Sequence, residues 1–337
     1  MPGSAARPGA TPPEDAPLVS VTRGSLVESH HRGRIVFCDP SGEVLEATGD
    51  PDGYAYVRSS AKPFQALPLV LSGAADIYGL TDEELAVVCA SHNAEGRHLE
   101  AVRSILDKAS LSERDLQSGA HLPMYVPAAE ALARGGEEPR NIHGNCSGKH
   151  AGMLAVCVHE GWETRTYRDP DHPLRRWISD LVSQVCAVEP ESLIVGGDGC
   201  GLPAFAMPLR GLATGFARIA TGQHLPDDLS AAALRIRDAM RSHPFMVAGT
   251  GRLDTELMEA TQLVTKMGAE GMFAAGSPDG WGMAIKISDG AGRAVRPAAL
   301  SALLRRGVAL LESDPLVVRD LHGVEVGVMD AVPQNDR

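Results

Sequence analysis

Apolar and polar residues alternate near both ends of the chain, a pattern typical of half-buried β-strands. Residues 18–47 alternate in this way around a turn sequence at residues 39–42 (Asp-Pro-Ser-Gly), which predicts a meander of short strands. Residues 264–275 and 283–288 alternate like two neighbouring strands, and residues 277–280 (Ser-Pro-Asp-Gly) predict the turn between them. We therefore expect antiparallel strands at both ends of the chain.

The middle of the chain instead shows the spacing of amphipathic helices. Thr81 and Glu84 form a capping box that begins a helix running to Val88. Further helices are predicted over residues 97–108, 151–158, 173–186, 229–240 and 297–311. Residues 193–195 are typical of a short buried strand, whereas residues 111–141 are too irregular to assign. Strands at both ends with helices between them predict an α+β fold, in which an antiparallel sheet packs with helices beside a mainly helical region.

The chain is predicted to form one catalytic domain with a short segment at each end. Residues 1–17 are rich in proline, alanine and glycine without a hydrophobic stretch, which predicts a disordered lead rather than a signal peptide. No internal repeat or flexible linker divides residues 18–327, and residues 328–337 are expected to be a loose tail.

Composition limits the partners and the compartment. The net charge of −12 argues against nucleic acid or an anionic membrane as a partner, and no run approaches the roughly 18 apolar residues of a membrane span. We therefore expect a cytoplasmic protein, in which six cysteines indicate free thiols or a metal site rather than a disulfide framework. Four of them are predicted to be core thiols: Cys38, Cys89, Cys157 and Cys186.

Lysine is scarce, which makes each lysine a candidate for chemistry. The 31 cationic residues include only five lysines, at positions 62, 108, 149, 266 and 286. Arginine keeps its proton in a protein, whereas lysine can lose it and then act as a base or bind a metal. Lys108 is the expected exception, because it lies in a helix with a polar face.

Ser59 and Lys62 are three residues apart, so a helix places them on one face. Burial disfavours the charged form of lysine, and a neutral Lys62 could take the proton of Ser59 and make it a nucleophile. Taken alone, this pair is better explained by a capped surface helix.

Two further motifs follow in chain order. Ser91-x-Asn93 lies in a polar loop, and Lys266, with a glycine two residues later, lies on a predicted strand. With Ser59-x-x-Lys62, they fit the template of the penicillin-recognising serine hydrolases and the serine glutaminases. The alternative is that Ser91 and Asn93 only turn a loop and that Lys266 is an exposed strand residue.

Two more segments lie outside that template, at residues 145–153 (Asn-Cys-Ser-Gly-Lys-His-Ala-Gly-Met) and 198–203 (Asp-Gly-Cys-Gly-Leu-Pro). Together with residues 58–63, 90–92 and 266–269, they closely resemble the Rhizobium-type L-asparaginases of the asparaginase II family. The resemblance extends from about residue 19 to residue 326, and Asn-Cys-Ser-Gly-Lys-His is its most specific part.

The resemblance implies a homodimeric enzyme that hydrolyses L-asparagine to aspartate and ammonia, on a fold related to serine β-lactamases and glutaminases. It implies two Ser–Lys pairs, Ser59 with Lys62 and Ser91 with Lys266. Ser59 is then the nucleophile and Lys62 its base, while Ser91, bridged by Lys266, relays a proton to the departing nitrogen. By analogy with the lactamase template, the oxyanion would lie between the backbone N–H groups of Ser59 and Ala269.

The resemblance also implies a zinc ion held by Cys146, Lys149 and Cys200. Spacing alone would not predict this site, because the usual ligands are cysteine, histidine and carboxylate. The alternatives are that Cys146 and Cys200 are small buried residues, or that they form a disulfide, which the cytoplasm disfavours.

Five residues are expected to bind the substrate. His150 and Asp198 lie beside the metal ligands, where they could orient those ligands or bind the α-amino and α-carboxylate groups of the substrate. For His150, a histidine satisfied at the start of a helix is the competing interpretation. Arg58, His92 and Ala269 complete the set: Arg58 and His92 are next to Ser59 and Ser91, and Ala269 is the second expected oxyanion donor.

Two other functions stay open at this point. A glutaminase or a β-lactam-acylating enzyme on the same fold is the first, since one methylene is worth only about 1–3 kcal/mol of discrimination in a pocket. The second is a non-catalytic zinc-binding paralogue. Loss of one of the four predicted catalytic residues would favour that reading, and all four are present.

Overall fold

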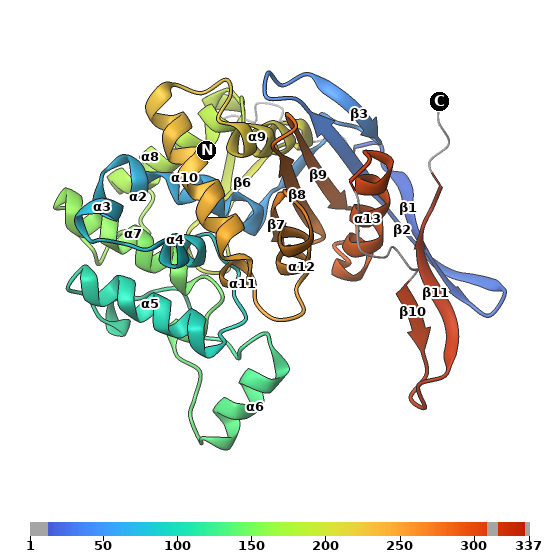
Figure 1. The fold of residues 1–337 in the computed structure, drawn as a ribbon, viewed down its shortest axis with the longest axis horizontal. Helices are drawn as coiled ribbons and strands as arrows, with labels where there is room; N and C mark the ends of the chain where they lie inside the picture. Colours follow the sequence, from blue (N-terminus) through green and yellow to red (C-terminus); the bar gives the residue numbers. More distant parts are fainter. Residues whose placement is uncertain (1–12, 309–315, 334–337) are drawn as a thin grey trace, which may run out of the picture.

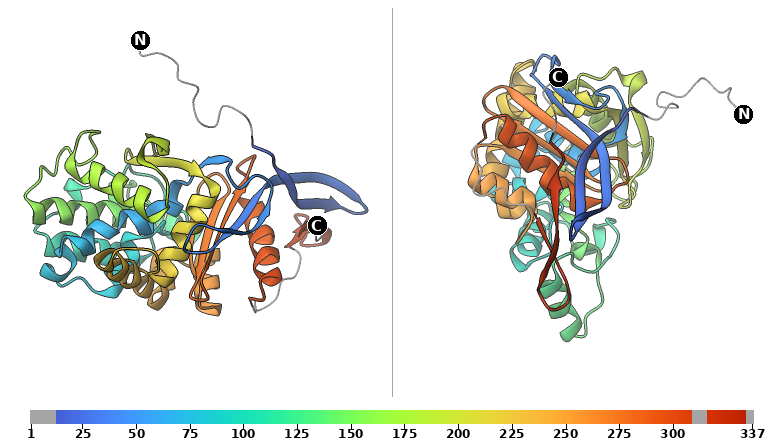
Figure 2. Two further views of the ribbon diagram at one scale, coloured as in Figure 1. Left: turned by 90° about the horizontal axis from the view of Figure 1, so that it is seen from above. Right: turned by 90° about the vertical axis from the view of Figure 1, so that its right-hand side faces the viewer.

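The computed structural model describes residues 13–308 and 316–333. It has two halves, an antiparallel sheet covered by helices and a cluster of helices beside it (Figure 1). Figure 2 shows the two halves side by side along the long axis of the molecule. The α+β prediction is confirmed.

The main sheet has eight strands in the described residues, in the order β10-β11-β1-β2-β9-β8-β7, with β3 paired to β2. Their bounds are β1 Ala16–Arg23, β2 Leu26–Cys38, β3 Val44–Thr48, β7 Val264–Gly268, β8 Met272–Ser277, β9 Trp281–Ile287, β10 Leu316–Arg319 and β11 Glu325–Ala331. Every neighbouring pair is antiparallel, and the two ends of the chain meet where Val19 pairs with Ala331.

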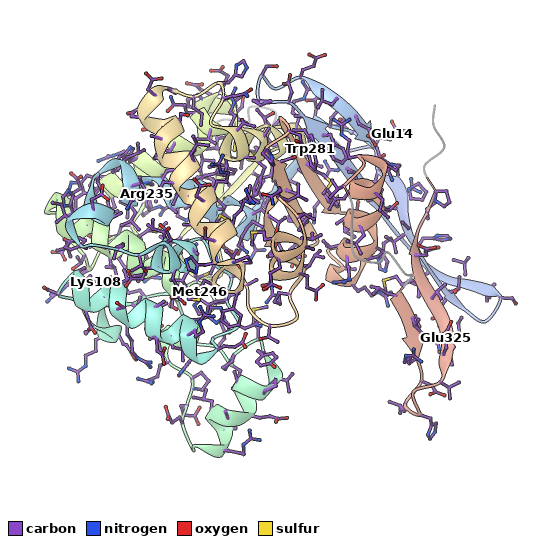
Figure 3. All side chains as sticks on the ribbon, viewed as in Figure 1. Glu14, Lys108, Arg235, Met246, Trp281 and Glu325 are labelled. Carbon is purple, nitrogen blue, oxygen red and sulfur yellow. The ribbon has the colours of Figure 1, made fainter. Side chains whose placement is uncertain are left out.

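Helices cover both faces of this sheet. Helix α9 (Leu209–Thr221) packs on one face, and α12 (Leu253–Ala260) and α13 (Val295–Arg305) pack on the other. Helix α9 lies so close to the strands that a Cβ on Gly276 would be 2.2 Å from the Phe216 carbonyl oxygen. In the core on the second face, the rings of Phe37 and Trp281 meet edge to face at 5.5 Å. Trp281 is labelled in Figure 3.

The helical half is built from short helices around α7 (Figure 1). Their bounds are α1 Lys62–Gln65, α2 Leu67–Leu71, α3 Ala74–Ile77, α4 Asp82–Val88, α5 Gly96–Lys108, α7 Ser147–Glu160, α8 Pro173–Val185, α10 Asp227–Ser242 and α11 Pro244–Val247. The predicted capping box is confirmed, because Thr81 and Glu84 exchange side-chain and backbone hydrogen bonds at the start of α4. A second sheet, in the order β4-β6-β5, lies beside this half, with β4 Tyr54–Tyr56, β5 Ile194–Gly197 and β6 Pro203–Pro208.

Several boundaries differ from the predictions. Residues 264–275 form two strands, because Glu270 and Gly271 take the left-handed conformation and turn the chain. Residues 193–195 contribute to an edge strand rather than a buried one, and Val195 is 47% exposed. Helix α6 (Val126–Arg134) forms within the segment that could not be assigned, and it projects from the rest of the molecule (Figure 1).

The expected ends of the domain also need correction. Strand β1 already includes residues 16 and 17, and β11 includes residues 328–331, so part of the expected lead and tail belongs to the sheet. The reason is that residues 16 and 17 pair with Gly33 and Arg32 of β2, while residues 329–331 pair with residues 19–21 of β1. The final helix ends at Arg305, and the rest of its predicted range includes residues outside the described part of the chain. In the described residues, no helix is long and apolar enough to cross a membrane.

Candidate active site

Ser59 lies on a strained turn between β4 and α1. The short 3₁₀ helix Arg58–Ala61 begins with Arg58 in the left-handed conformation (φ 48°), which costs a side-chain-bearing residue about 1–3 kcal/mol. Ser59 follows at once and is half-buried. Among the described residues its hydroxyl has no hydrogen-bond partner, so the turn presents a free hydroxyl.

Lys62 begins α1 and is fully buried. Its Nζ donates to Ser91 Oγ at 2.9 Å, to the Ala90 carbonyl oxygen, and more weakly to the Asn145 carbonyl oxygen at 3.4 Å. The first and second motifs therefore meet, but Lys62 contacts Ser91 and makes no hydrogen bond with Ser59. The predicted hydroxyl partner of Lys62 is Ser59, whereas in the structure it is Ser91.

Burial dominates the electrostatics of Lys62. It lowers the pKa of the amine, and the charge of Lys149 lowers it further, whereas Cys146 raises it. No described carboxylate forms an ion pair with Lys62. Lys62 therefore has the surroundings of an amine that can give up its proton.

Lys266 lies on β7 and is also fully buried. Its Nζ donates to the Met267 carbonyl oxygen at 3.0 Å and lies 3.6 Å from Asp254 Oδ2. Burial lowers its pKa to about 8, although the Asp254 carboxylate opposes that shift. No hydrogen bond joins Lys266 to Ser91 in the described chain, so the predicted second pair is not formed as a direct contact.

Ser60 connects the first motif to the third. Its Oγ donates to the Lys266 carbonyl oxygen at 2.9 Å, and the hydroxyl is buried. Gly268 allows this contact, because an added Cβ would lie 3.0 Å from both Ser60 Oγ and the Val57 carbonyl oxygen. The strand and the turn that carries Ser59 are thereby held together.

The loop after α4 positions Ser91 through its neighbours. His92 is buried, its Nδ1 accepts the N–H of Ala94, and its Nε2 lies 2.8 Å from Ser147 Oγ. Both ring nitrogens therefore have protein partners, and a direct role of His92 toward substrate stays a prediction. The Asn93 side chain also has protein partners, since its Oδ1 accepts a hydrogen bond from Arg252.

The N–H groups of Ser59 and Ala269 are available for an oxyanion. Neither donates a hydrogen bond within the described residues. Ala269 is exposed in the turn between β7 and β8, and Ser59 lies on the turn that Ser60 ties to β7. This arrangement fits the predicted oxyanion site, which stays a prediction.

Cys146, Lys149 and Cys200 come together although 51 residues separate Lys149 from Cys200. Lys149 Nζ lies 3.4 Å from Cys200 Sγ. The Cys146 thiol donates to Asn145 Oδ1 at 3.3 Å and is close enough to Lys149 and Cys200 to change the pKa of both. Gly148 lets α7 approach α4, since a Cβ there would be 2.1 Å from the Val87 carbonyl oxygen.

The charges of this cluster suit a metal. The hydrogen bond with Cys200 lowers the pKa of Cys146 well below its ordinary value, and the pKa of Cys200 is raised by the same bond. Burial would lower the pKa of Lys149, but the two cysteines raise it above the ordinary value. Within the described residues no three His, Cys, Asp or Glu side chains form a metal-binding group, so any metal here must use the amine. Two sulfurs and one nitrogen fit a zinc ion by their chemistry.

All six cysteines are free and buried. The core assignment of Cys38, Cys89, Cys157 and Cys186 is confirmed, since each is completely buried. Burial raises the pKa of Cys38 to about 11 and the pKa of Cys157 to about 12, so these thiols stay protonated. Lys108, the expected exception among the lysines, pairs with Glu84 at the periphery (Figure 3).

Asp198 joins Arg58 to the cysteine cluster. Its Oδ1 accepts hydrogen bonds from Arg58 Nη2 at 2.8 Å and from Arg58 Nε at 3.1 Å. Burial would raise the pKa of Asp198, but the charges of Lys149 and Arg58 bring it below the ordinary value. Arg58 also lines a cavity of about 410 Å³ with Tyr56, Glu270 and other residues.

His150 is completely buried on α7. Its Nδ1 lies 2.6 Å from Tyr167 Oη, and its Nε2 has no hydrogen-bond partner among the described residues. Burial and the charge of Lys149 lower its pKa, so the ring is neutral. Only one of the two ring nitrogens of His150 therefore has a hydrogen-bond partner among the described residues. A role of His150 toward substrate stays a prediction.

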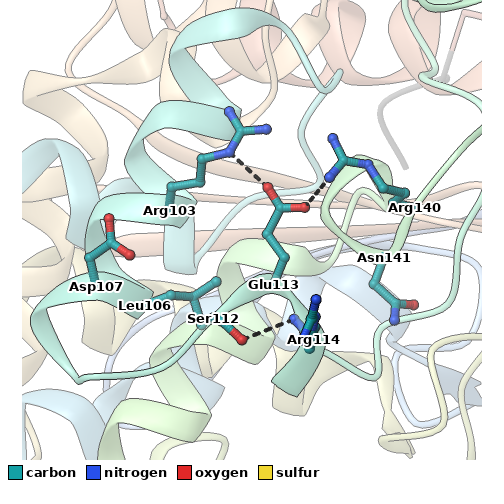
Figure 4. Close-up of a pocket in the computed structure, with 8 residues that line it drawn as sticks. All are labelled: Arg103, Leu106, Asp107, Ser112, Glu113, Arg114, Arg140 and Asn141. Carbon is teal, nitrogen blue, oxygen red and sulfur yellow. Dashed lines mark hydrogen bonds and ion pairs between the residues drawn. The ribbon is translucent and has the colours of Figure 1, made fainter. Parts of the chain in front are cut away.

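A separate cavity of about 530 Å³ lies beside α5 (Figure 4). Its central group is Glu113, which pairs with Arg103 at 2.8 Å and with Arg140 at 2.6 Å. None of the predicted catalytic residues lines this cavity. Its carboxylate is neutralised by two arginines, and we do not assign it to the active site.

Comparison with known proteins matches residues 19–326 to the family of L-asparaginase II. The chain belongs to the L-asparaginase II family. That membership supports an amidohydrolase, as expected, while the closer resemblance to Rhizobium-type enzymes stays a prediction. No curated protein matches this L-asparaginase II family member in sequence.

Two solved structures illustrate its distant structural relatives. Mglu in its native form has 14% sequence identity and a TM-score of 0.48, with 86% of this chain and 69% of Mglu covered. A β-lactamase from Mycobacterium bovis has 16% identity and a TM-score of 0.43, with 82% of this chain and 95% of the lactamase covered. Likenesses at these TM-scores carry no argument about function.

Three residues of this L-asparaginase II family member were missed from sequence. Ser60 lies inside the first motif, and a hydroxyl there could have been suspected from its position alone. Asp254 lies outside the segments quoted for the resemblance, and nothing in the sequence indicates its burial beside Lys266. Tyr167 had no signal at all.

Proposed function

We propose that the protein hydrolyses the side-chain amide of L-asparagine to L-aspartate and ammonia. The observation that supports this best is the position of Lys62, a buried amine without a carboxylate partner, 2.9 Å from Ser91 Oγ. It lies one helical turn from Ser59, whose hydroxyl has no partner among the described residues. Such a group of residues is what amide cleavage by a serine requires.

In the proposed acylation step, Ser59 Oγ attacks the side-chain carbonyl carbon while its proton passes to neutral Lys62. Catalytic hydrogen bonds are often long in a free enzyme and shorten when substrate binds, so the missing Ser59–Lys62 contact does not exclude this transfer. The oxyanion is stabilised by the N–H groups of Ser59 and Ala269.

Lys62 then passes the proton through Ser91 to the amide nitrogen, and the C–N bond breaks to release ammonia. A water molecule attacks the resulting ester while Lys62 takes one of its protons. Return of that proton to Ser59 releases aspartate and restores the enzyme. Each step uses a group that Lys62 contacts or can reach from α1.

We also propose that Cys146, Lys149 and Cys200 hold a zinc ion. When bound, the ion would supply a positive charge that helps to orient the substrate. Asp198 and Arg58 lie next to this cluster and offer opposite charges, which suits the α-amino and α-carboxylate groups of an amino acid. His150, with its unpartnered Nε2, is a further candidate for this recognition.

The decisive experiment measures ammonia release from L-asparagine and L-glutamine by purified protein supplied with zinc. We expect turnover of asparagine and much slower turnover of glutamine. The Ser59→Ala variant should be inactive, whereas Lys108→Arg should match the unmodified protein. Absence of ammonia from millimolar asparagine would reject the proposal, and faster glutamine turnover would favour a glutaminase.

We further propose a cytoplasmic homodimer. Six free thiols fit a reducing compartment. The β10–β11 hairpin extends from the sheet (Figure 1), and β10 ends the described sheet with Val317 exposed on it. An unpaired strand edge is a surface on which a second copy can add its own strand. Analytical ultracentrifugation should give a dimer, and Val317→Lys should shift it toward monomer.

A further inference from the structure

The two buried lysines of the site have different neighbours. Lys62 forms no ion pair with a described carboxylate, whereas Lys266 Nζ lies 3.6 Å from Asp254 Oδ2. The side chains of Lys266 and Asp254 are 0% and 1% exposed. The acidic neighbour of Lys266 is thus a carboxylate, whereas that of Lys62 is the Cys146 sulfur.

Apart from Lys266, no described side chain or hydrogen-bond partner stabilises the charge of Asp254. Neither carboxylate oxygen has a hydrogen-bond partner among the described residues. A buried carboxylate without a partner is strongly destabilising, and Lys266 is the only described cation within ion-pair distance of it. The carboxylate is in the first turn of α12, where the helix dipole also favours a negative charge.

The remaining charged or titratable groups near Lys266 do not replace Asp254. Lys62 and Arg252 are cations that disfavour a second positive charge. Cys146 acts in the same direction as Asp254 but more weakly, and the Cys89 thiol is protonated because burial raises its pKa to about 12. Among these neighbours, Asp254 is the main group that favours the ammonium form.

We propose that Asp254 is a positioning residue of the amidase reaction, which holds the Lys266 side chain in place and keeps it protonated. This inference rests on the proposed function for its catalytic meaning, but the ion pair itself does not. A fixed ammonium at the end of β7 supplies positive charge to the site, while Lys62 alone serves as base. Even with Asp254 present, burial brings the pKa of Lys266 to about 8, so loss of the carboxylate should bring its titration midpoint close to pH 7 or below.

The scarcity of lysine makes a direct test practical. Protein labelled with ¹³C at lysine Cε should give five resonances, and Lys266→Arg identifies the one that belongs to Lys266. In the unmodified protein we expect Lys266 to be protonated at pH 7. In Asp254→Asn its titration midpoint should fall by about one pH unit or more, as expected for loss of an opposite charge nearby. Glu256→Gln is the matched control, because it removes an ion pair of the same helix with Arg296 and should not move the midpoint.

The same shift in the titration midpoint of Lys266 should also change how the catalytic rate depends on pH. In Asp254→Asn, the alkaline limb of the kcat profile should move to lower pH by the same amount, with little change in KM. A merely structural role would instead lower stability and scale kcat equally at every pH. A Lys266 that is neutral at pH 7 in the unmodified protein, or an unchanged midpoint in Asp254→Asn, would overturn the inference. The NMR titration needs no turnover, so an inactive unmodified protein would reject the proposed function alone.

Discussion

Lys62 Nζ lies 2.9 Å from Ser91 Oγ, although 29 residues separate the two in the chain. The base predicted for the first serine is thus in contact with the second. This relationship suggests a proton path from Ser59 through Lys62 to Ser91, in place of two independent Ser–Lys pairs. Lys266, held by Asp254, then contributes charge rather than a second base.

Replacement of Lys62 by arginine keeps the positive charge but removes the ability to accept a proton, so it tests the two roles separately. Arginine stays protonated in a protein, so Lys62→Arg should lower kcat/KM for asparagine by about 10²–10⁴-fold, the usual contribution of a general base. An ammonia-release assay measures the effect, and circular dichroism checks the fold. Lys108→Arg is the control, because Lys108 pairs with Glu84 away from the site. If Lys62→Arg retains most of its activity, another group must be the base.

Zinc binding should depend on the protonation of Lys149. The two cysteines hold its pKa above the ordinary value in the metal-free protein, so the metal must displace a proton. Zinc affinity should therefore fall steadily as pH decreases, which competition with a chromogenic chelator can measure. Elemental analysis should find about one zinc per chain in the unmodified protein and less in Lys149→Arg and Cys200→Ser.

The kinetic effect of these zinc-site variants should lie mainly in KM, since the nucleophile is a serine. Cys157→Ala provides the control, because Cys157 is a buried thiol outside the cluster. Stoichiometric zinc in both ligand variants, or an unchanged KM after metal removal, would show that the site is wrongly assigned.

Asp198 should contribute to substrate binding through its charge. Asp198→Asn removes the ion pair with Arg58 at 2.8 Å, and we expect KM for asparagine to rise by roughly tenfold, the equivalent of about 1.4 kcal/mol. Steady-state kinetics with asparagine measures this effect. Asp52→Asn is a matched control, because it removes an exposed ion pair with Arg210. Equal KM values for Asp198→Asn and the control would exclude Asp198 from substrate binding.

The packing of α9 on the sheet is so close that one added methyl group should lower the stability of the protein. Gly276→Ala would place Cβ 2.2 Å from the Phe216 carbonyl oxygen, so we expect a loss of about 1–3 kcal/mol in the free energy of unfolding. Urea denaturation measures this loss. Gly96→Ala should change stability little, because no atom lies within 4 Å of the added Cβ. Equal stability of the two variants would mean that the helix shifts freely on the sheet.

The sequence patterns predicted the local elements well and their long-range partners poorly. The alternating segments became strands, and the capping box at Thr81 began a helix as expected. The turn at Glu270 was missed, because a left-handed residue other than glycine has no clear sequence signal. The edge position of Val195 was also missed, since a short apolar run looks the same in a buried and in an exposed strand.

In the candidate active site, too, the sequence predicted the residues better than the contacts between them. The motifs identified the residues that the structure brings together, including Lys149 and Cys200 across 51 positions. They did not predict that Lys62 contacts Ser91, because the distance between two loops depends on tertiary packing. Asp254 was missed for a related reason, since one acidic residue in an amphipathic helix is usually exposed. Only its burial beside Lys266 marks it.

The distribution of amines has a consequence for conjugation chemistry. Lys62, Lys149 and Lys266 are buried, and the Lys286 amine lies against the Glu270 carbonyl oxygen. Lys108, with 30% of its side chain exposed, pairs with Glu84, whereas the half-buried Lys286 lines the cavity that also contains Arg58. Among the described lysines, reagents that acylate amines should therefore react mainly at Lys108 and Lys286. Replacement of Lys286 by arginine would then leave Lys108, on α5, as the main described lysine through which the protein can be attached to a solid support.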